Sequence, residues 1–355
     1  MTHRQRLKKT CNLLKQEGLD GMLVASPSNI SYLSGYASRD SYLLISPKEN
    51  IYITDFRYAN EARACLDRSF KVMKVQLSIF KRIAILCEEL KLKRVAFEER
   101  VMPFAEIEKI REESSKKFEF IPKHGIIEQL RRIKSADELR KLKAAVRITI
   151  EAMRFIKDFI QPGRREIEIA GELERFIRYN GAKSAAFDII VASGPNSAFP
   201  HHIASQRKLK NDEPVLIDMG VDYLGYKSDL TRMFFLGRIT PLVRKIYEIV
   251  LAAQERAIKS IRPATKMRIV DSAARQYITR RGYGGFFGHN LGHGIGLDVH
   301  EEPCISSREE SKLSAGMLFT VEPAVYLPGK FGIRIEDVAL VTGRGCEVLS
   351  GGLDK

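Results

Sequence analysis

Hydrophobic and polar residues follow two different periods in the first third of the chain. Apolar residues at helical spacing predict helices near residues 6–17 and 77–92. Short apolar runs bounded by turn residues predict strands at GMLVAS (21–26), DSYLLIS (40–46), IYIT (51–54) and RVAFEE (94–99). Because strands and helices take turns here, we expect a small α/β domain.

A long helical pattern follows between residues 123 and 160. We interpret its first part as one helix and its second part as another, which starts at a capping box formed by Ser135 and Glu138. The second helix stops before Gln161-Pro162-Gly163. We therefore place the domain boundary here and expect one domain over residues 1–125 and another over 126–355.

The second domain combines amphipathic helices with alternating, strand-like stretches. The expected order is a helix over 166–180 capped by Gly181, strands over 188–194 and 214–221, a turn at Leu224-Gly225, a strand over 228–237, helices over 241–260 and 267–281, and strand-rich sequence to the end. We predict an α+β class with a long antiparallel sheet.

Composition agrees with a globular protein of two domains. The chain has 355 residues, of which 44% are hydrophobic and 29% charged. No apolar run reaches the roughly 18 residues of a membrane span, and the basic start MTHRQRLKKT leads into no apolar leader. The five cysteines form no C-x-x-C pair, so we expect reduced thiols and a cytoplasmic protein.

The net charge of +15 raises the possibility of a polyanionic partner. The densest basic cluster alternates with apolar residues, as the solvated face of one amphipathic helix would. No aromatic stacking platform accompanies it, so no nucleic-acid partner is expected. The cluster consists of Arg131, Arg132, Lys134, Arg140, Lys141, Lys143 and Arg147.

Candidate chemistry begins with two aspartates on the predicted hairpin. Asp218 ends the run PVLID, and Asp229 follows eleven positions later (229 − 218) across a short turn. An antiparallel hairpin can bring these two carboxylates side by side. Adjacent carboxylates repel each other unless one holds a proton or cations lie between them.

Further acidic and imidazole groups follow at the ends of predicted strands. LGHGIGLDVHEEP contains His293 and His300, VEPAVY contains Glu322, and IRIEDVAL places Arg334 and Glu336 on one face of a strand. Four carboxylates with one imidazole suit manganese, iron(II) or cobalt, and can neutralise two divalent ions. Taken singly, each aspartate could be a turn former and each histidine a core residue. GHGIG lacks the lysine and the spacing of a phosphate-binding loop.

The wording and order of the motifs resemble one family. NISYLSGY, DSYLLIS and YITDFRY look like a creatinase-type N-terminal domain; VASGPNSAFPHH, LIDMGVDYLGYKSDLTR, HNLGHGIGLDVHEEP, TVEPAVY and IRIEDV look like a pita-bread metallopeptidase domain. The chain thus resembles the branch of Xaa-Pro dipeptidases (prolidases) and Xaa-Pro aminopeptidases (aminopeptidase P). This resemblance implies a pita-bread (creatinase/aminopeptidase) catalytic domain preceded by a smaller α/β creatinase-type domain.

The resemblance also implies two divalent metal ions, for which manganese is our first choice and cobalt, iron or zinc are alternatives. It makes His293 and Glu322 ligands of the first ion, Asp218 a ligand of the second, and Asp229 and Glu336 bridging ligands. A hydroxide between the ions is the implied nucleophile. Glu322 is the implied proton acceptor and shuttle.

Other residues match family positions outside the ligand set. His201, His289 and His300 match active-site histidines that bind substrate and act on the intermediate, and Arg334 and Tyr326 match residues beside the ligands. Two positions depart from the usual wording. Asn290 stands where Gly, Ser or Tyr is more common, and His202 stands where Gly is frequent, so both bear on substrate choice. Cys304 is interpreted as a small buried residue.

We therefore expect an exopeptidase that cleaves the bond between an N-terminal residue and proline, as a homodimer in keeping with the family. Methionine aminopeptidases usually lack this N-terminal domain, and creatinases lack the metal carboxylates. A metal-free binding module of the same fold is a third alternative, although such relatives have generally lost ligands. The sequence leaves dipeptidase and aminopeptidase activity both open.

Overall fold

The computed structural model describes residues 1–37, 39–115 and 118–355. It separates into two compact units, Met1–Arg131 and Arg132–Lys355. The division lies after the expected boundary at residue 125 because the short helix α6 (Glu128–Arg131) is bound to the first unit. Asn29 Nδ2 donates to Glu128 Oε1 at 2.6 Å, and Arg131 Nη1 donates to Asn29 Oδ1 at 2.8 Å.

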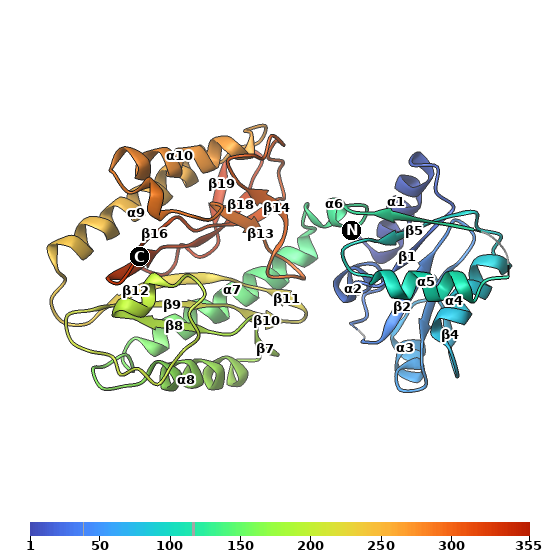
Figure 1. Cartoon of the computed structure of the whole chain (residues 1–355), viewed down its shortest axis with the longest axis horizontal. Coiled ribbons are helices and arrows are strands. Elements are labelled where there is room, and N and C mark those ends of the chain that lie inside the picture. The colour runs from blue at the N-terminus through green and yellow to red at the C-terminus, as the bar shows by residue number, and fades with distance from the viewer. Residues whose placement is uncertain (38, 116–117) are drawn as a thin grey trace. The chain divides into compact units, whose positions relative to one another are not determined.

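The first unit is an α/β domain, as its alternating pattern predicted. Its remaining elements are α1 (His3–Gln16), β1 (Gly21–Val24), α2 (Pro27–Ser34), β2 (Ser41–Ile45), β3 (Asn50–Thr54), α3 (Ala59–Cys65), β4 (Lys71–Lys74), α4 (Ile79–Glu89), β5 (Arg94–Glu98), α5 (Phe104–Glu112) and β6 (Glu119–Lys123). The strands among them form one mixed sheet in the order β4-β3-β2-β1-β5-β6 (Figure 1). Side chains such as Leu23, Ile53 and Val95 fill the core between this sheet and its helices.

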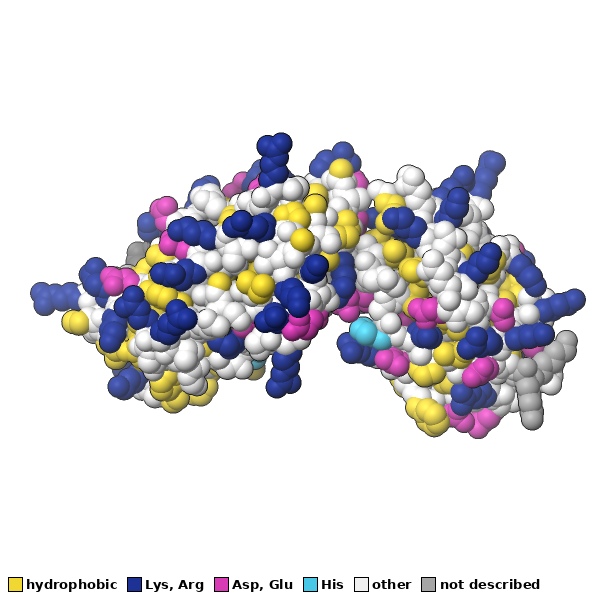
Figure 2. All heavy atoms as spheres, turned by 90° about the horizontal axis from the view of Figure 1, so that it is seen from above, with side chains coloured by type: hydrophobic (Ala, Val, Ile, Leu, Met, Phe, Trp, Pro, Cys, Tyr) yellow, Lys and Arg dark blue, Asp and Glu magenta, His cyan; other side chains and the backbone are white. Residues whose placement is uncertain are grey.

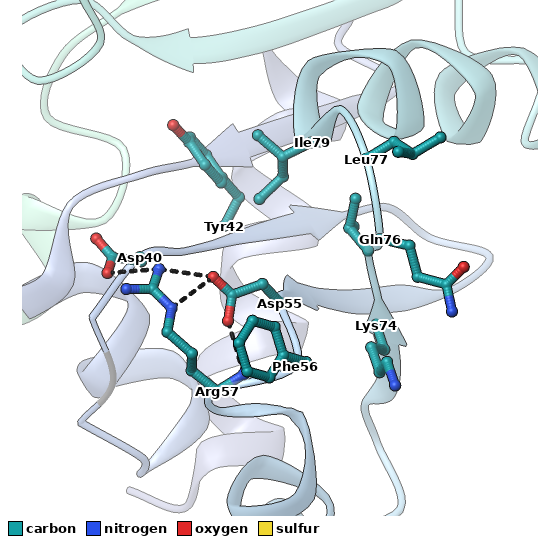
Figure 3. A pocket seen from close by; sticks show the side chains of 10 residues that line it. Asp40, Tyr42, Asp55, Phe56, Arg57, Lys74, Gln76, Leu77 and Ile79 are labelled. Atoms are coloured by element: carbon teal, nitrogen blue, oxygen red, sulfur yellow. Dashed lines mark hydrogen bonds and ion pairs between the residues drawn. The ribbon is translucent and has the colours of Figure 1, made fainter.

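This unit contains a surface pocket of about 670 Å³. Arg57 points between two carboxylates in it, lying 3.1 Å from Asp40 and 2.6 Å from Asp55 (Figure 3). Phe56 and Leu77, which also line the pocket, are 72% and 99% exposed. None of the candidate site residues named above lines this pocket.

The second unit is built from antiparallel strands and four longer helices. Its helices are α7 (Ala136–Ile156), α8 (Glu166–Tyr179), α9 (Pro241–Ser260), α10 (Met267–Arg280) and the short η1 (Gly194–Ala198) and η2 (Gly284–Phe286). Its strands are β7 (Ser184–Ala185), β8 (Ile190–Ser193), β9 (Pro214–Met219), β10 (Val221–Tyr223), β11 (Tyr226–Lys227), β12 (Leu230–Phe235), β13 (Gly292–Gly294), β14 (Glu301–Ile305), β15 (Leu318–Val321), β16 (Ala324–Leu327), β17 (Phe331–Arg334), β18 (Asp337–Val341) and β19 (Cys346–Val348).

Helices line both sides of these strands. α7 and α8 contact strands of the first half of the unit, and α9 and α10 contact strands of the second half (Figure 1). The antiparallel pairing was predicted, but the strands divide into sheets of three, three, five and two strands instead of one long sheet. One break lies at Gly220, where a Cβ atom would overlap the backbone oxygen of Ser228.

The local signals in the sequence account for several element ends. Glu138 Oε2 accepts hydrogen bonds from the backbone nitrogen of Ser135 at 2.9 Å and from its Oγ at 2.7 Å, so the capping box is confirmed. Gly181, at φ +89°, follows the end of α8. Leu224 and Gly225 both have positive φ and form the turn between β10 and β11.

Two expectations about the segment before α7 were wrong. The first predicted helix is reduced to α6, because Ile133 instead pairs with Met317 in a β-bridge. The basic cluster is not one solvated face: Arg131 and Lys134 are buried, and Lys134 Nζ lies 2.5 Å from Glu301 Oε1. Elsewhere, lysines and arginines are scattered over the face seen in Figure 2. No helix in the described ranges is long and apolar enough to cross a membrane.

Candidate metal centre

The hairpin of β9 and β12 carries the first two acidic residues of the site. Asp218 lies near the end of β9 opposite Thr231, and Asp229 comes directly before β12. The two aspartates are buried, and the charge of Asp218 helps to raise the pKa of Asp229. The pairing of β9 and β12 thus brings these two positions close together, as the hairpin spacing predicted.

Three further residues reach this hairpin from the second half of the unit. His293 lies on β13, Glu322 directly follows β15, and Glu336 lies between β17 and β18. His293 Nε2 is 3.6 Å from Asp229 Oδ2 and 3.2 Å from Glu322 Oε1. One ligand atom each of Asp229, His293 and Glu336 lies within 4.8 Å of the others, which is close enough for a shared cation.

The electrostatics of this cluster are those of a cation site. Burial, and then the charges of neighbouring carboxylates, raise the pKa of Asp229 and of Glu336 well above the ordinary values. Among the residues that the structure describes, Asp218 Oδ1 and Glu336 Oε1 are buried with no hydrogen-bond partner. Buried oxygens of this kind are costly unless something binds them, and an oxygen-rich set with one imidazole fits divalent manganese, iron or cobalt.

His293 and Glu322 behave as a pair. Burial alone would raise the pKa of Glu322, but the hydrogen bond and the charge of His293 outweigh it and lower that pKa. At His293 burial lowers the pKa of the imidazole, but Glu322, together with the backbone oxygen of Gly294 and the charge of Asp218, outweighs it and raises that pKa. His293 Nδ1 lies 3.1 Å from the backbone oxygen of Gly294, which directs Nε2 toward the carboxylates.

A hydrogen-bonded network orients the carboxylates. Thr231 Oγ1 donates to Glu336 Oε2 at 2.8 Å and accepts from Arg334 Nε at 3.0 Å. Arg334 Nη2 donates to Asp218 Oδ2 at 2.5 Å. On the other side, Thr320 Oγ1 donates to Glu322 Oε1 at 3.1 Å. The two threonines were missed from the sequence, although Thr231 lies opposite Asp218 in the predicted hairpin.

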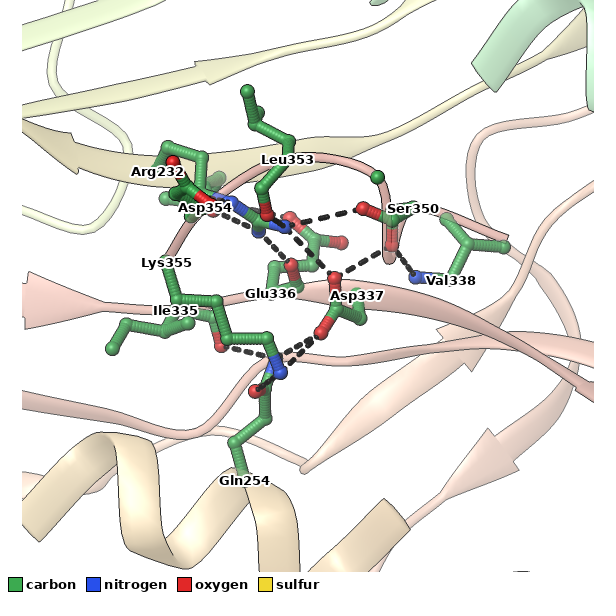
Figure 4. Close-up of polar contacts among 12 residues, drawn as sticks. Arg232, Gln254, Ile335, Glu336, Asp337, Val338, Ser350, Leu353, Asp354 and Lys355 are labelled. Carbon is green, nitrogen blue, oxygen red and sulfur yellow. Dashed lines mark hydrogen bonds and ion pairs between the residues drawn. The ribbon is translucent and has the colours of Figure 1, made fainter. Parts of the chain in front are cut away.

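A second charged network holds the strand behind Glu336 (Figure 4). Arg232 Nη1 donates to the backbone oxygen of Glu336, and its Nη2 donates to Asp337 Oδ1 at 2.9 Å. Lys355 Nζ lies 2.6 Å from Asp337 Oδ2, and Ser350 Oγ donates to Asp337 Oδ1 at 2.6 Å. The last residues of the chain therefore pack against the strand that presents Glu336.

Two of the predicted histidines lie beside the carboxylates. The rings of His300 and His293 are edge to face, with centroids 4.3 Å apart. His289 Nε2 lies 3.3 Å from Tyr326 OH, which accepts from Arg334 Nη1 at 2.6 Å. Burial lowers the pKa of both His289 and His300, and neighbouring positive groups add to the effect. Both rings are thus favoured in the neutral form.

The side chains at the two unusual positions, Asn290 and His202, both make specific contacts. Asn290 Nδ2 donates to Cys304 Sγ at 3.2 Å, and Cys304 is half-buried. His201 is exposed on the loop after η1, and its backbone neighbour Pro200 accepts a hydrogen bond from Arg334 Nη1 at 3.3 Å. His202 Nε2 lies 2.8 Å from Glu166 Oε2. Glu166 was missed because an acidic residue in a first helical turn is ordinary.

Comparisons with known proteins agree over both units. Residues 140–343 match metallopeptidase family M24, and residues 6–133 match the creatinase/prolidase N-terminal domain. The Xaa-Pro dipeptidase of Pyrococcus furiosus is 35% identical over 98% of both chains. The structure of an Xaa-Pro dipeptidase from Bacillus anthracis is similar with a TM-score of 0.96 at 37% identity, covering 100% of this chain and 99% of the other. An X-Pro aminopeptidase from Thermotoga maritima has a TM-score of 0.89 at 38% identity over 97% of both chains.

Proposed function

Because the chain belongs to metallopeptidase family M24 and carries a creatinase/prolidase N-terminal domain, we propose that this peptidase cleaves Xaa-Pro bonds with two divalent ions. Its relatives include proteins named Xaa-Pro dipeptidase and one named X-Pro aminopeptidase. The substrates we assign are peptides with proline in the second position. The enzyme class and the need for metal follow from the family, and the substrate and the number of ions are our proposal.

The buried carboxylate cluster carries this proposal. Asp229 and Glu336 would bridge the ions, His293 and Glu322 would bind one of them, and Asp218 the other. Asp218 Oδ1 and Glu336 Oε1 are available for this, since no hydrogen bond from any residue in the described ranges reaches them. When bound, the ions would supply an activated water and polarise the scissile carbonyl. We favour manganese because the donors are mainly carboxylate oxygens.

Glu322 is our choice for the group that accepts and returns a proton. Its Oε1 is already engaged, 3.1 Å from Thr320 Oγ1 and 3.2 Å from His293 Nε2. Its Oε2 is therefore the oxygen that we assign to proton transfer. In the metal-free protein the pKa of Glu322 is lowered by its contact with His293, and the carboxylate is ionised at neutral pH.

The remaining side chains would handle the substrate. His300, held against His293, is favoured as a neutral imidazole that can donate a hydrogen bond to the developing oxyanion. His289 uses both ring nitrogens, Nδ1 toward the backbone oxygen of Asn290 and Nε2 toward Tyr326 OH, so its ring would help to orient Tyr326 beside the substrate. His201 would contact the substrate from the loop after η1. Arg334 would act indirectly, since its guanidinium is already used to orient Asp218 and Tyr326.

We also propose a cytoplasmic homodimer, following the family resemblance. All five cysteines are free thiols, which agrees with a reducing compartment. Size-exclusion chromatography with light scattering would measure the mass: a value twice the 40.3 kDa of one chain is expected, and a monomer would refute the dimer.

The activity is tested by incubating manganese-loaded protein with Ala-Pro and, separately, with Ala-Pro-Ala. Cleavage of only the dipeptide would identify a prolidase, and release of alanine from the longer peptide would identify an aminopeptidase P. Ala-Ala and Ala-Ala-Ala serve as matched substrates without proline, and a chelated sample serves as the metal control. Metal content is measured on the same sample. If metal binds but neither proline peptide is cleaved, the Xaa-Pro assignment is wrong.

A further inference from the structure

Glu166 is a buried carboxylate that collects hydrogen bonds from one loop. Its Oε1 accepts from the backbone nitrogen of Ser193 at 2.8 Å, from Ser193 Oγ at 2.6 Å and from Asn196 Nδ2 at 3.0 Å. Its Oε2 accepts from Ser205 Oγ at 2.5 Å and lies 2.8 Å from His202 Nε2. Glu166 has no exposed surface. One side chain at the start of α8 thus ties together both ends of the segment 193–205.

His202 is the member of this cluster that lies next to a proposed substrate residue. Its side chain is only 13% exposed and its ring is directed into the Glu166 cluster, where Nε2 also lies 3.2 Å from Asn196 Nδ2. From the sequence, the departure from glycine at this position bears on substrate choice. The observed contact instead commits His202 Nε2 to Glu166.

The residue before His201 is anchored as well. Pro200 O accepts a hydrogen bond from Arg334 Nη1 at 3.3 Å, and Arg334 also orients Asp218. Earlier in the same loop, Ser197 Oγ accepts a hydrogen bond from the backbone nitrogen of Gly332 at 2.9 Å. A Cβ atom at Gly332 would overlap the backbone oxygen of Ser197, so the loop is pressed against β17.

We propose that Glu166 and His202 are positioning residues for His201. His201 is flanked by two fixed neighbours, Pro200 through its oxygen and His202 through its ring, so its backbone has little freedom. The side chain of His201 remains exposed and can meet a substrate. The role of His201 itself rests on the proposed function.

A positioning role differs from a purely structural role in one respect. If Glu166 and His202 act through His201, their loss must cost activity only while His201 is present. If they merely stabilise the domain, their loss would change activity equally with or without His201. A double-mutant cycle on kcat separates the two cases.

The experiment measures kcat and KM on the proline peptide that the wild-type enzyme cleaves, together with the metal content of each variant. His202→Ala is expected to lower kcat about tenfold with metal content unchanged. His202→Gln, which keeps an N–H donor for Glu166, is expected to retain most of the wild-type kcat. Glu166→Gln serves as a second probe in case His202→Ala does not fold. His3→Ala, a half-buried histidine of the first unit, is the matched control.

In the His201→Ala background, His202→Ala is expected to change kcat by less than about twofold. A second tenfold loss in that background, or loss of metal from His202→Ala, would overturn the inference. NMR of the histidine rings tests the positioning role without a substrate. The His201 ring signals are identified by their loss in His201→Ala. They should shift or broaden in His202→Ala and stay unchanged in His3→Ala. An enzyme that cleaves no proline peptide yet shows this change would refute the proposed function alone, whereas an unchanged His201 signal would refute the positioning role.

Discussion

Arg334 and Asp218 are 116 positions apart in the chain, yet Arg334 Nη2 donates a 2.5 Å hydrogen bond to Asp218 Oδ2. The guanidinium is buried and also donates to Thr231 Oγ1 and Tyr326 OH. One planar cation therefore orients a proposed metal ligand, the threonine that holds Glu336, and the tyrosine beside His289. The other oxygen of Asp218 is left to face the carboxylate cluster.

Arg334→Lys is expected to weaken manganese binding about tenfold and to lower kcat/KM at least as much, because an ammonium group with its three donors cannot reproduce the four divergent hydrogen bonds of the guanidinium. Isothermal titration with manganese measures the first effect and peptide hydrolysis the second. Arg344→Lys, on the exposed turn between β18 and β19, is the matched control and should behave as wild type. Wild-type affinity and activity in Arg334→Lys would show that the network does not orient Asp218.

Asp229→Asn is expected to abolish hydrolysis and bound metal together, since it removes a bridging charge from the buried cluster. Metal analysis after dialysis against manganese, alongside the peptide assay, measures both. Asp158→Asn changes an exposed aspartate after α7 and should retain metal and activity. If Asp229→Asn is fully active when metal-replete, the assignment of Asp229 as a bridging ligand is wrong.

His300→Ala is expected to lower kcat about a hundredfold while leaving metal content unchanged, as expected for a group that acts on the intermediate. The ring of His300 lies edge to face against that of the proposed ligand His293, and His300 is not one of the metal ligands that we assign. Stopped assays with metal analysis on the same preparation test this. Loss of metal from His300→Ala would instead make His300 a ligand or a support of His293.

The stabilisation of the protein by manganese is expected to increase with pH. In the metal-free protein the raised pKa of Asp229 and Glu336 means that the folded state binds these protons more tightly than the unfolded state. The two protonated carboxyl groups make their whole contribution to folding stability below the unfolded pKa of about 4. This contribution is lost as pH rises through the folded pKa. Manganese replaces the protons, so its effect is largest where they have been lost.

Thermal unfolding at about pH 5.5 and about pH 8, with manganese and with chelator, measures this difference. The gain in Tm on adding manganese should be larger at the higher pH, and Asp229→Asn should reduce the pH dependence. An equal gain at both pH values would show that metal binding is not linked to these carboxyl groups.

Local patterns in the sequence predicted the elements that carry the site. The hairpin spacing of Asp218 and Asp229 is a local property, and so is the capping of α7 by Ser135 and Glu138. The helix α2 was overlooked, although Ser26 and Pro27 form an ordinary helix start there. The prediction for the segment before α7 was wrong because its residues have partners far along the chain. Ile133 forms a β-bridge with Met317, and Lys134 forms an ion pair with Glu301.

The support of the site lay beyond local patterns. The spacing of Glu166 and His202 does not indicate that the carboxylate of Glu166 binds the loop that contains His202. Arg232 has the sequence features of an ordinary strand residue, and only its contacts with Glu336 and Asp337 show its role. Family resemblance supplied the proposed ligands and the histidines that we propose to face the substrate. The groups behind them became visible only through tertiary contacts.

The large separation of these partners has a consequence for synthesis of the protein. Asp218 meets Arg334 across 116 residues, and Arg232 meets the oxygen of Leu353 across 121. Contacts this distant in sequence close late, because the intervening chain must first be ordered. A ribosome-bound fragment that stops short of β17 contains Asp218 and Asp229 but neither Arg334 nor Glu336. Because Glu336 is a proposed bridging ligand and Arg334 orients Asp218, the proposed metal centre is complete only once the C-terminal strands have emerged from the ribosome.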